Sequence, residues 1–356
     1  PSPPAQPVWQ TWHQNNPHRQ LRSDAFILGT QIRIDDSQTT PYDLNSELLD
    51  PLHLKDDKLK FSRPGAFIYL VSHGRFIKRL TISVNHLVQN FFAVNPENRS
   101  RYEIVVIYYP DVTPGDKKVV ESGTTYRGVT IPIRWHPFPA PQIPYTLLEQ
   151  HLGDLPQYQT TCESFGWKKN YLLMGMFRAQ TQFMIPLLQQ YEYIWTLDAD
   201  LFIESPIICD VFAAMKQQHL GLGHYDFGFE PEECSMAGLR QVTKHWARIN
   251  HIDTCWADQV PKQSSYGGAF IIHDMRLFSS DVYQSMAAYF IKTGGLWKHR
   301  WAEQNLWPYV VALLAPGKSH QFGGLKISHK HVGEMIWTNR ETFHMFYDPV
   351  CKPFLS

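Results

Sequence analysis

Two short apolar runs separated by an amphipathic segment constrain the fold of this chain more than any other feature. The runs cover residues 66–71 (AFIYLV) and 103–109 (EIVVIYY). Continuous apolar runs of this length are typical of strands buried on both faces of a parallel sheet. Between them, apolar side chains recur at the spacing of one helix face, at Leu80, Val84, Leu87, Val88 and Phe91. Strand, helix and strand in this order predict a βαβ unit, which begins an α/β sheet.

The remaining sequence continues this alternation. The apolar patterns predict strands over residues 129–134, 193–197 and 269–272, and helices over residues 170–190, 281–290 and 306–315. Asp281 and Gln284 have the spacing of a capping box at the start of one of these helices. We therefore expect an α/β fold.

Charge and hydropathy exclude several classes of partner. The 33 Lys and Arg residues balance 33 Asp and Glu residues, and no long basic run is present, so nucleic acid is not the expected partner. No apolar run approaches the roughly 18 residues of a membrane helix. Residue 1 is a proline, and the opening PSPPAQP is typical of an extended linker. We expect contact with a membrane only through an N-terminal anchor that has been removed.

The cysteines are compatible with two compartments. Five are present, at Cys162, Cys209, Cys234, Cys255 and Cys351, without a C-x-x-C motif, so a zinc site is not expected. Two disulfides and one free thiol would indicate a secretory chain, whereas five reduced thiols would indicate the cytosol. The triplet Asn98-Arg99-Ser100 has the pattern of a glycosylation acceptor.

The strongest local chemical signal is Asp198-Ala199-Asp200, the only D-x-D in the sequence. It follows the predicted strand over residues 193–197, and ligands of open α/β sheets bind beyond the carboxyl ends of strands. A hard divalent cation is commonly held by one or two carboxylates and by substrate phosphates. The motif therefore predicts a site for a metal and a diphosphate, with loop-capping aspartates as the alternative interpretation.

Two histidines near the end of the chain are candidates for a third metal ligand. His329 and His331 lie in the segment LKISHKH, and neutral imidazole complements carboxylates on Mn²⁺-like ions. Satisfied surface or core histidines are the alternative.

Several segments, in this order along the chain, resemble the fungal α-1,2-mannosyltransferases, a family of retaining GT-A-fold enzymes of the Golgi. The segment YEYIWTLDAD resembles the family's YEYYWR run, which ends in two acids separated by one residue. Similar matches occur at Tyr171 with Met176-Phe177-Arg178, at DMRLFSSDVY, at TGG followed by RWAE, and at KSHQF followed by ISHKH. The resemblance covers about residues 165–335, roughly half the chain.

The resemblance implies a GT-A-like catalytic domain, with a Rossmann-like, nucleotide-sugar-binding mixed sheet flanked by helices. It also implies a metal-dependent, retaining glycosyltransferase. The expected donor is GDP-mannose, or another hexose or pentose carried by UDP, and the expected acceptor is a glycan or glycoprotein. The implied cofactor is Mn²⁺ or Mg²⁺. The implied location is the Golgi lumen, as the soluble part of a type II membrane protein. We expect a stem and wrapping arm over residues 1–62, a nucleotide half over 63–200, an acceptor half over 201–345 and a tail over 346–356.

Individual residues can be carried over from the matching motifs. Asp198 and Asp200 match the acidic metal and nucleotide segment. His331 matches the family's closing histidine best, with His329 as the alternative. Glu303 matches an acid expected to hold a sugar hydroxyl, and Arg178 is a cationic candidate beside the diphosphate. The expected catalytic residues are therefore Glu303, Asp200 and Arg178.

Further candidates surround these positions. Those for the nucleotide are Ser72, His73, Arg75, Tyr171, Arg178 and Asp198. Those for the acceptor are Tyr266, Gly267, Gly268, Trp297, Trp301 and Glu303. The paired glycines allow close approach of the backbone, and tryptophan rings can stack on sugars, although buried core tryptophans are the alternative interpretation.

One departure from the family pattern bears on mechanism. The family's F-E-I, whose acid is a candidate nucleophile, is Phe270-Ile271-Ile272 in this chain. A covalent mechanism through that acid is therefore not expected, whereas a front-face retaining mechanism remains open. Two other functions also remain open: a carbohydrate-binding protein of the same fold without turnover, and a nucleotidyltransferase.

Overall fold

The computed structural model describes residues 61–72, 74–139, 169–225, 227–229, 235–261, 263–322, 325–331 and 334–337. All of them belong to one compact unit, residues 41–356. The predicted stem lies almost entirely outside the described residues, and the predicted tail lies wholly outside them.

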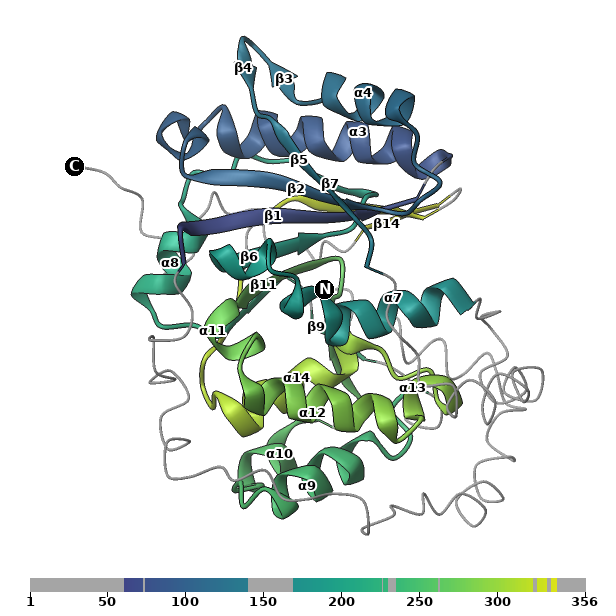
Figure 1. The fold of residues 1–356 in the computed structure, drawn as a ribbon. Coiled ribbons are helices and arrows are strands. Elements are labelled where there is room, and N and C mark those ends of the chain that lie inside the picture. Colours follow the sequence, from purple (N-terminus) through teal and green to yellow (C-terminus); the bar gives the residue numbers. More distant parts are fainter. Residues whose placement is uncertain are drawn as a thin grey trace, which may run out of the picture. The chain divides into compact units, whose positions relative to one another are not determined.

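A seven-stranded sheet forms the centre of the fold, in the order β12-β8-β11-β6-β1-β2-β5 (Figure 1). Its neighbours pair in parallel, except that β11 runs antiparallel to both β6 and β8. The sheet is therefore mixed, which confirms the predicted fold class. Its strands are β1 (Arg63–Val71), β2 (Tyr102–Tyr108), β5 (Ile133–Pro137), β6 (Tyr191–Leu197), β8 (Leu222–His224), β11 (Phe270–Asp274) and β12 (Ser319–Gln321).

Smaller sheets attach to this framework. One has the order β14-β13-β7, and two hairpins pair β10 with β9 and β3 with β4. Their strands are β3 (Thr125–Tyr126), β4 (Val129–Thr130), β7 (Leu201–Ile203), β9 (Phe227–Phe229), β10 (Ser264–Tyr266), β13 (Ile327–His331) and β14 (Glu334–Trp337). Because β7 directly follows the D-x-D, the β14-β13-β7 sheet lies next to the candidate metal site.

Helices cover both faces of the central sheet, with α3 and α4 on one side and α7, α11, α12 and α14 on the other (Figure 1). The helices are α3 (Arg75–Leu87), α4 (Pro114–Ser122), α7 (Lys169–Ala179), α8 (Val211–Gln217), α9 (Leu239–Ile249), α10 (Cys255–Gln259), α11 (Met275–Phe278), α12 (Asp281–Lys292), α13 (Gly295–Lys298) and α14 (Glu303–Leu314). Short π or 3-10 turns occupy η5 (Val88–Phe92), η6 (Pro96–Arg99), η7 (Thr181–Met184) and η8 (Leu188–Gln190). The predicted α/β layering is thus present.

The core under α3 is built from aromatic side chains. Phe67 of β1 lies with its ring centroid 4.9 Å from that of Phe91, 5.1 Å from that of Trp195 and 5.3 Å from that of Phe212. Phe67, Phe91 and Trp195 are all fully buried. Edge and tilted contacts between rings stabilise such a core beyond the effect of burial alone. This packing fixes β1 and β6 side by side, and the D-x-D follows β6.

Three predicted elements differ from those in the structure. The helix expected over residues 170–190 ends at Ala179, where the side-chain amide of Gln182 donates to the carbonyl of Arg178 at 2.6 Å. Pro186 would also prevent one continuous helix from reaching residue 190. The strand expected over residues 129–134 is divided at Pro132 into β4 and β5.

The third difference concerns the start of α12. The N-cap is Ser280, whose hydroxyl accepts a hydrogen bond from the amide of Tyr283, and not the predicted pair of Asp281 and Gln284. A serine with extended backbone geometry is a favoured N-cap, so the helix begins at Asp281, one residue earlier than the capping-box spacing implied.

Two sequence-level expectations can also be compared with the described residues. Asn98 has 0% exposure, so its side chain is not accessible to glycosylation in the folded protein, and the prediction from its triplet is not supported. Within the described part of the chain, no helix combines the length and the apolar character needed to cross a membrane.

Candidate active site

The two aspartates of the D-x-D lie in a tight turn between β6 and β7. The amide of Asp198 donates to the carbonyl of Ala269 at 3.1 Å, and the carbonyl of Asp198 accepts from the amide of Leu201, also at 3.1 Å. These bonds fix the turn to the start of β11. Asp200 is 6% exposed, so its carboxylate needs nearby cationic partners or hydrogen bonds.

A histidine from a distant part of the sequence completes this acidic pair. Strand β13 runs antiparallel to β7 with His329 opposite Leu201, which places the imidazole beside Asp200. The Nε2 atom of His329 lies 3.1 Å from Oδ1 of Asp200 and 3.4 Å from Oδ2 of Asp198. One ligand atom from each residue lies within 4.8 Å of the others. Two carboxylates and one imidazole suit a Mn²⁺-like ion, so this donor set fits the predicted metal.

Arg178 on α7 connects the acidic pair to two other parts of the site. Its Nη2 atom pairs with Oδ1 of Asp198, and its Nη1 atom donates to the carbonyl of Gly268 at 3.0 Å. The same Nη1 lies 3.6 Å from Oε1 of Glu303. Burial acts to lower the pKa of Arg178, but the charges of Asp198 and Glu303 raise it above its ordinary value. Arg178 is therefore a fixed, buried cation beside the metal ligands.

Glu303 is the first residue of α14 and is 3% exposed. Burial raises the pKa of its carboxyl, while the charge of Arg178 acts in the opposite direction. The amide groups at a helix N-terminus also favour a carboxylate there. Two glycines lie close to it. A Cβ at Gly268 would lie 3.5 Å from Oε1 of Glu303 and only 2.9 Å from Oε1 of the neighbouring Gln304, and one at Gly175 would lie 3.6 Å from Oε2 of Glu303.

Arg79 on α3 belongs to this site, although sequence reasoning did not identify it. Its Nη1 atom lies 3.1 Å from Oδ2 of Asp200. The sequence analysis selected Arg75, one helical turn earlier, because it follows the first strand more closely. The sequence did contain one indication of Arg79: it is a basic residue one turn after Arg75 on the same predicted helix.

The ionisation of the metal ligands reflects their mutual contacts. Burial would lower the pKa of His329, but hydrogen bonds to Asp198 and Asp200, together with their charges, raise it to about 9. Burial would raise the pKa of Asp198, but Arg178 and His329 hold it well below its usual range. Without a metal, the Asp198 carboxylate is therefore ionised, with Arg178 and His329 beside it.

The structure locates the other nucleotide candidates only in part. Ser72 directly follows β1, and Tyr171 lies on α7 with its ring centroid 6.0 Å from the guanidinium carbon of Arg300. His73 lies outside the described residues. Arg75 begins α3, but its side chain is outside the described part, as is that of His331 on β13. The preference for His331 over His329 thus stays a prediction, while His329 is in contact with the acidic pair.

The acceptor candidates separate into two groups. Gly267 and Gly268 follow β10 and lie beside Arg178, and Tyr266 stacks on His224 with ring centroids 4.1 Å apart. Trp301 is 1% exposed, and its Nε1 donates to the carbonyl of Ala237 at 2.9 Å. No face of that ring is available to a sugar, so the structure does not support Trp301 as an acceptor contact.

Two further positions belong to this comparison. Trp297 lies in α13, but its side chain is outside the described part of the chain. Ile271, which replaces the acid of the family's F-E-I, is fully buried in β11 opposite Thr196 and His224. Arg178 has two carboxylates beside it, those of Asp198 and Glu303, and neither is on β11.

A mixed α/β sheet with an acidic pair after its central strand, and a histidine brought beside that pair, defines a glycosyltransferase of the GT-A type. More particularly, the chain belongs to the glycolipid 2-alpha-mannosyltransferase family, whose model matches residues 44–354. The fungal mannosyltransferase resemblance in the sequence is thereby confirmed.

Individual relatives agree with this family. A probable mannosyltransferase, KTR3 of Saccharomyces cerevisiae, is 23% identical over 176 residues, which are 46% of this chain and 43% of that protein. Core-mannan synthase A of Aspergillus fumigatus, solved in a Mn/GDP form, has a TM-score of 0.60 at 18% identity, with 82% of each chain covered. The mannosyltransferase Ktr4p of S. cerevisiae in complex with GDP also has a TM-score of 0.60 at 18% identity, covering 86% of this chain and 85% of that one. At these identities the solved structures show the shared fold.

Proposed function

We propose that this chain is a metal-dependent, retaining mannosyltransferase that transfers mannose from GDP-mannose to a glycan or glycoprotein acceptor. One observation carries the proposal: Asp198, Asp200 and His329 form a ligand set for a divalent ion at the end of β6, with Arg178 and Glu303 beside it. Family membership supports the sugar, and the Mn/GDP form of core-mannan synthase A supports the metal and the nucleotide.

In the proposed mechanism, the chain's own residues bind and orient the donor. A divalent ion on Asp198, Asp200 and His329 would supply a Lewis acid for the diphosphate. Arg178 adds a preorganised positive charge, held in place by Asp198, Glu303 and the Gly268 carbonyl. Glu303 accepts a hydrogen bond from a hydroxyl of the transferred sugar.

The bond changes follow a front-face route. The acceptor hydroxyl oxygen forms a bond to the anomeric carbon, while the bond from that carbon to the phosphate oxygen breaks. The hydroxyl proton passes to the departing phosphate, so GDP and the mannosylated acceptor are the products. Ile271 supports this route over double displacement, because an aliphatic side chain at that position cannot form a covalent intermediate.

The experiment is a transfer assay with GDP-mannose, methyl α-mannoside and Mn²⁺, followed by NMR of the product's anomeric proton. We expect release of GDP and an α-linked product, with no trapped glycosyl-enzyme. A panel of UDP-sugars in parallel tests the donor. A β-linked product, or release of pyrophosphate from a nucleoside triphosphate in place of GDP release, would overturn the proposal.

A second candidate function is a saccharide-binding protein of the same fold without turnover. The buried Ile271 in place of an acid favours it. The two functions differ in one measurement: GDP-mannose would bind in both cases, but only the enzyme would release GDP at a rate that depends on added acceptor.

We also propose that the protein resides in the Golgi lumen. Support comes from family membership, and a disulfide at the buried Cys209 would add to it. Cys255, by contrast, has an exposed free thiol. Disulfides persist in oxidising compartments such as the secretory pathway.

A further inference from the structure

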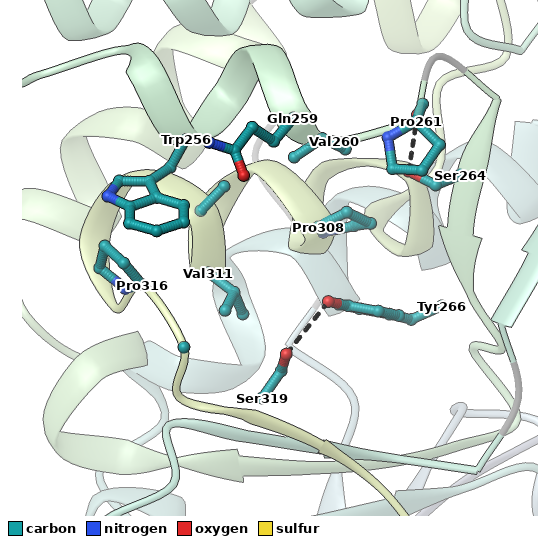
Figure 2. Close-up of a pocket in the computed structure, with 12 residues that line it drawn as sticks. Trp256, Gln259, Val260, Pro261, Ser264, Tyr266, Pro308, Val311, Pro316 and Ser319 are labelled. Carbon is teal, nitrogen blue, oxygen red and sulfur yellow. Dashed lines mark hydrogen bonds between the residues drawn. The ribbon is translucent and has the colours of Figure 1, made fainter.

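A pocket distinct from the metal site lies between α10, α14 and the strands β10 and β12 (Figure 2). Its volume is about 200 Å³. We call it the Trp256 pocket; it is lined by Trp256, Gln259, Val260, Pro261, Ser264, Tyr266, Pro308, Val311, Ala312, Pro316, Gly317 and Ser319. Sites for drug-sized ligands typically occupy roughly 300–1,000 Å³, so this one suits a single ring and not a nucleotide.

The lining of the Trp256 pocket indicates a neutral, partly apolar ligand. None of its lining residues carries a charge, which argues against a phosphate, a nucleotide or a metal ion. Trp256 is 49% exposed, an unusual state for the largest apolar side chain, and its indole forms one side of the pocket (Figure 2). A half-exposed indole with amide and hydroxyl groups around it can stack on the apolar face of a sugar and hydrogen-bond the hydroxyls.

Polar groups line the pocket near the Trp256 indole. Gln259 contributes an exposed side-chain amide. On the opposite side, the Tyr266 hydroxyl lies 3.4 Å from the hydroxyl of Ser319 (Figure 2). Ser264 also lines the pocket, but it is fully buried and its hydroxyl donates to the carbonyl of Pro261 at 2.8 Å, so it supports the wall and does not contact a ligand. Hydroxyl and amide groups of this kind pair readily with sugar hydroxyls.

Two elements connect the Trp256 pocket with the metal site. Strand β10 ends at Tyr266 in the pocket wall, and two residues later the Gly268 carbonyl accepts from Arg178. Helix α14 begins at Glu303 and reaches the pocket at Pro308 and Ala312. At 1.5 Å per residue, these positions lie about 8 and 13 Å further along the helix axis, a separation that a short oligosaccharide can span.

We propose that the Trp256 pocket is a subsite for one neutral sugar unit of the acceptor glycan, remote from the unit that receives mannose. This inference rests on the proposed function, since it assumes that the acceptor is a glycan. The Trp256 indole stacks on the sugar ring, and Gln259 bonds a hydroxyl. The protein would then prefer oligosaccharide acceptors to single sugars because the extra unit adds contact area.

The test measures binding of α-1,2-mannotriose by calorimetry in EDTA, without nucleotide, so that it does not depend on transfer. We expect Trp256→Ala to weaken binding about tenfold, equivalent to about 1.4 kcal/mol, and Gln259→Ala to weaken it less. Trp256→Phe should keep most of the affinity. The matched control is Met184→Ala, which removes another exposed apolar side chain (55% exposed) that does not line the pocket. Melting temperatures establish that each variant folds.

Three outcomes overturn the subsite: no binding of mannotriose to the wild type, equal binding by Trp256→Ala, or equal losses in Trp256→Ala and Met184→Ala. A proline-rich peptide that binds in place of mannotriose in a Trp256-dependent manner would also overturn it. The proposed function fails separately, in the transfer assay with methyl α-mannoside. If the wild type transfers mannose but Trp256→Ala binds mannotriose as tightly as the wild type, only the subsite is rejected.

Discussion

At the scale of single residues, the site is a chain of alternating charges. Arg79, Asp200, His329, Asp198 and Arg178 follow one another, each in contact with the next. In the metal-free protein, cationic groups thus balance both carboxylates. A divalent ion must enter this arrangement in competition with them.

The first prediction concerns Asp200. We expect Asp200→Ala to abolish Mn²⁺ binding and Mn²⁺-dependent GDP binding, because one of the two carboxylates is lost from the donor set. Calorimetry measures both. The control is Asp258→Ala, an exposed acid paired with Lys244 outside the site. Normal Mn²⁺ binding by Asp200→Ala would contradict the assignment of the D-x-D.

For Arg79, in contrast to Asp200, we predict that substitution increases the affinity for Mn²⁺. Its guanidinium lies close to the position of the ion, and like charges repel. We therefore expect Arg79→Met to strengthen Mn²⁺ binding, on the order of tenfold, and Arg79→Lys to leave it nearly unchanged. Titration of Mn²⁺ by electron paramagnetic resonance, without nucleotide, provides the measurement. Weaker Mn²⁺ binding in Arg79→Met would mean that Arg79 instead holds Asp200 in its binding conformation.

His273 predicts a pH dependence of folding stability. It is fully buried in β11, with the rings of Phe183, Phe278 and Trp307 against it. Neither ring nitrogen has a hydrogen-bond partner. Burial, assisted by the charge of Arg178, lowers the pKa of His273 well below its ordinary value.

The sign of this dependence follows from proton binding. Below about pH 6.5 the unfolded chain takes up a proton at this position that the folded protein does not. The free energy of unfolding therefore decreases as the pH is lowered, by up to about 1.4 kcal/mol per pH unit from this group. We expect His273→Leu to reduce the slope of unfolding free energy between pH 6.5 and 5, measured by urea denaturation. An unchanged slope would show that His273 binds a proton as readily in the folded protein as in the unfolded chain, which would contradict the lowered pKa.

At the scale of elements, close packing between α13 and the start of α14 depends on one glycine. A Cβ on Gly295 would overlap the ring of Trp301, and that ring is buried against Phe290 with centroids 5.4 Å apart, so it cannot move aside. We expect Gly295→Ala to lower the free energy of unfolding by at least about 2 kcal/mol, in the range of overpacked cores.

The matched control for this change is Gly115→Ala in α4. A Cβ there would lie 3.6 Å from Oγ1 of Thr113, an ordinary contact. Alanine should be neutral or stabilise that helix by up to about 1 kcal/mol. Thermal and urea unfolding of both variants test the pair, and equal stabilities would contradict the packing argument.

Elements also explain what the sequence could reveal about the site. Asp198 and Asp200 could be placed because their position depends on one local feature, the end of an apolar strand. His329 and His331 could not be distinguished, because the choice depends on the register between β13 and β7. Trp301 was assigned to the acceptor because a sequence does not encode which tryptophan ring remains exposed, and Arg79 resembled any other arginine on a helix surface.

At the scale of the whole molecule, the α/β sheet with helices packed on it followed from the βαβ pattern, since continuous apolar runs indicate which strands are buried. The mixed character of the sheet was implied only by the family resemblance. The order of β8, β11 and β12 at one edge could not be predicted. The apolar run of β11 indicated a strand, but β8 and β12 are three residues long and lack a distinctive pattern. The pocket built from α10, α14, β10 and β12 depends on that order.

The final prediction concerns the covalent state of the whole chain. If it matures in an oxidising lumen, mass spectrometry of the non-reduced protein should detect at least one disulfide, with Cys209 as one partner and Cys255 as a free thiol. Alkylation before digestion prevents exchange. Five alkylated cysteines in the protein isolated from cells would favour the cytosol.

The pairing of His329 with Asp200 also has a consequence for how the chain folds. The two residues are 129 positions apart in the sequence. The β14-β13-β7 sheet that joins them is distinct from the central sheet. Contacts between residues so distant in sequence carry a large loop-closure cost and tend to form late. The aspartates can therefore take their positions before the imidazole arrives, and the full three-ligand site exists only once folding is nearly complete. Tight binding of Mn²⁺ would then distinguish fully folded chains from chains that have not yet paired β13 with β7.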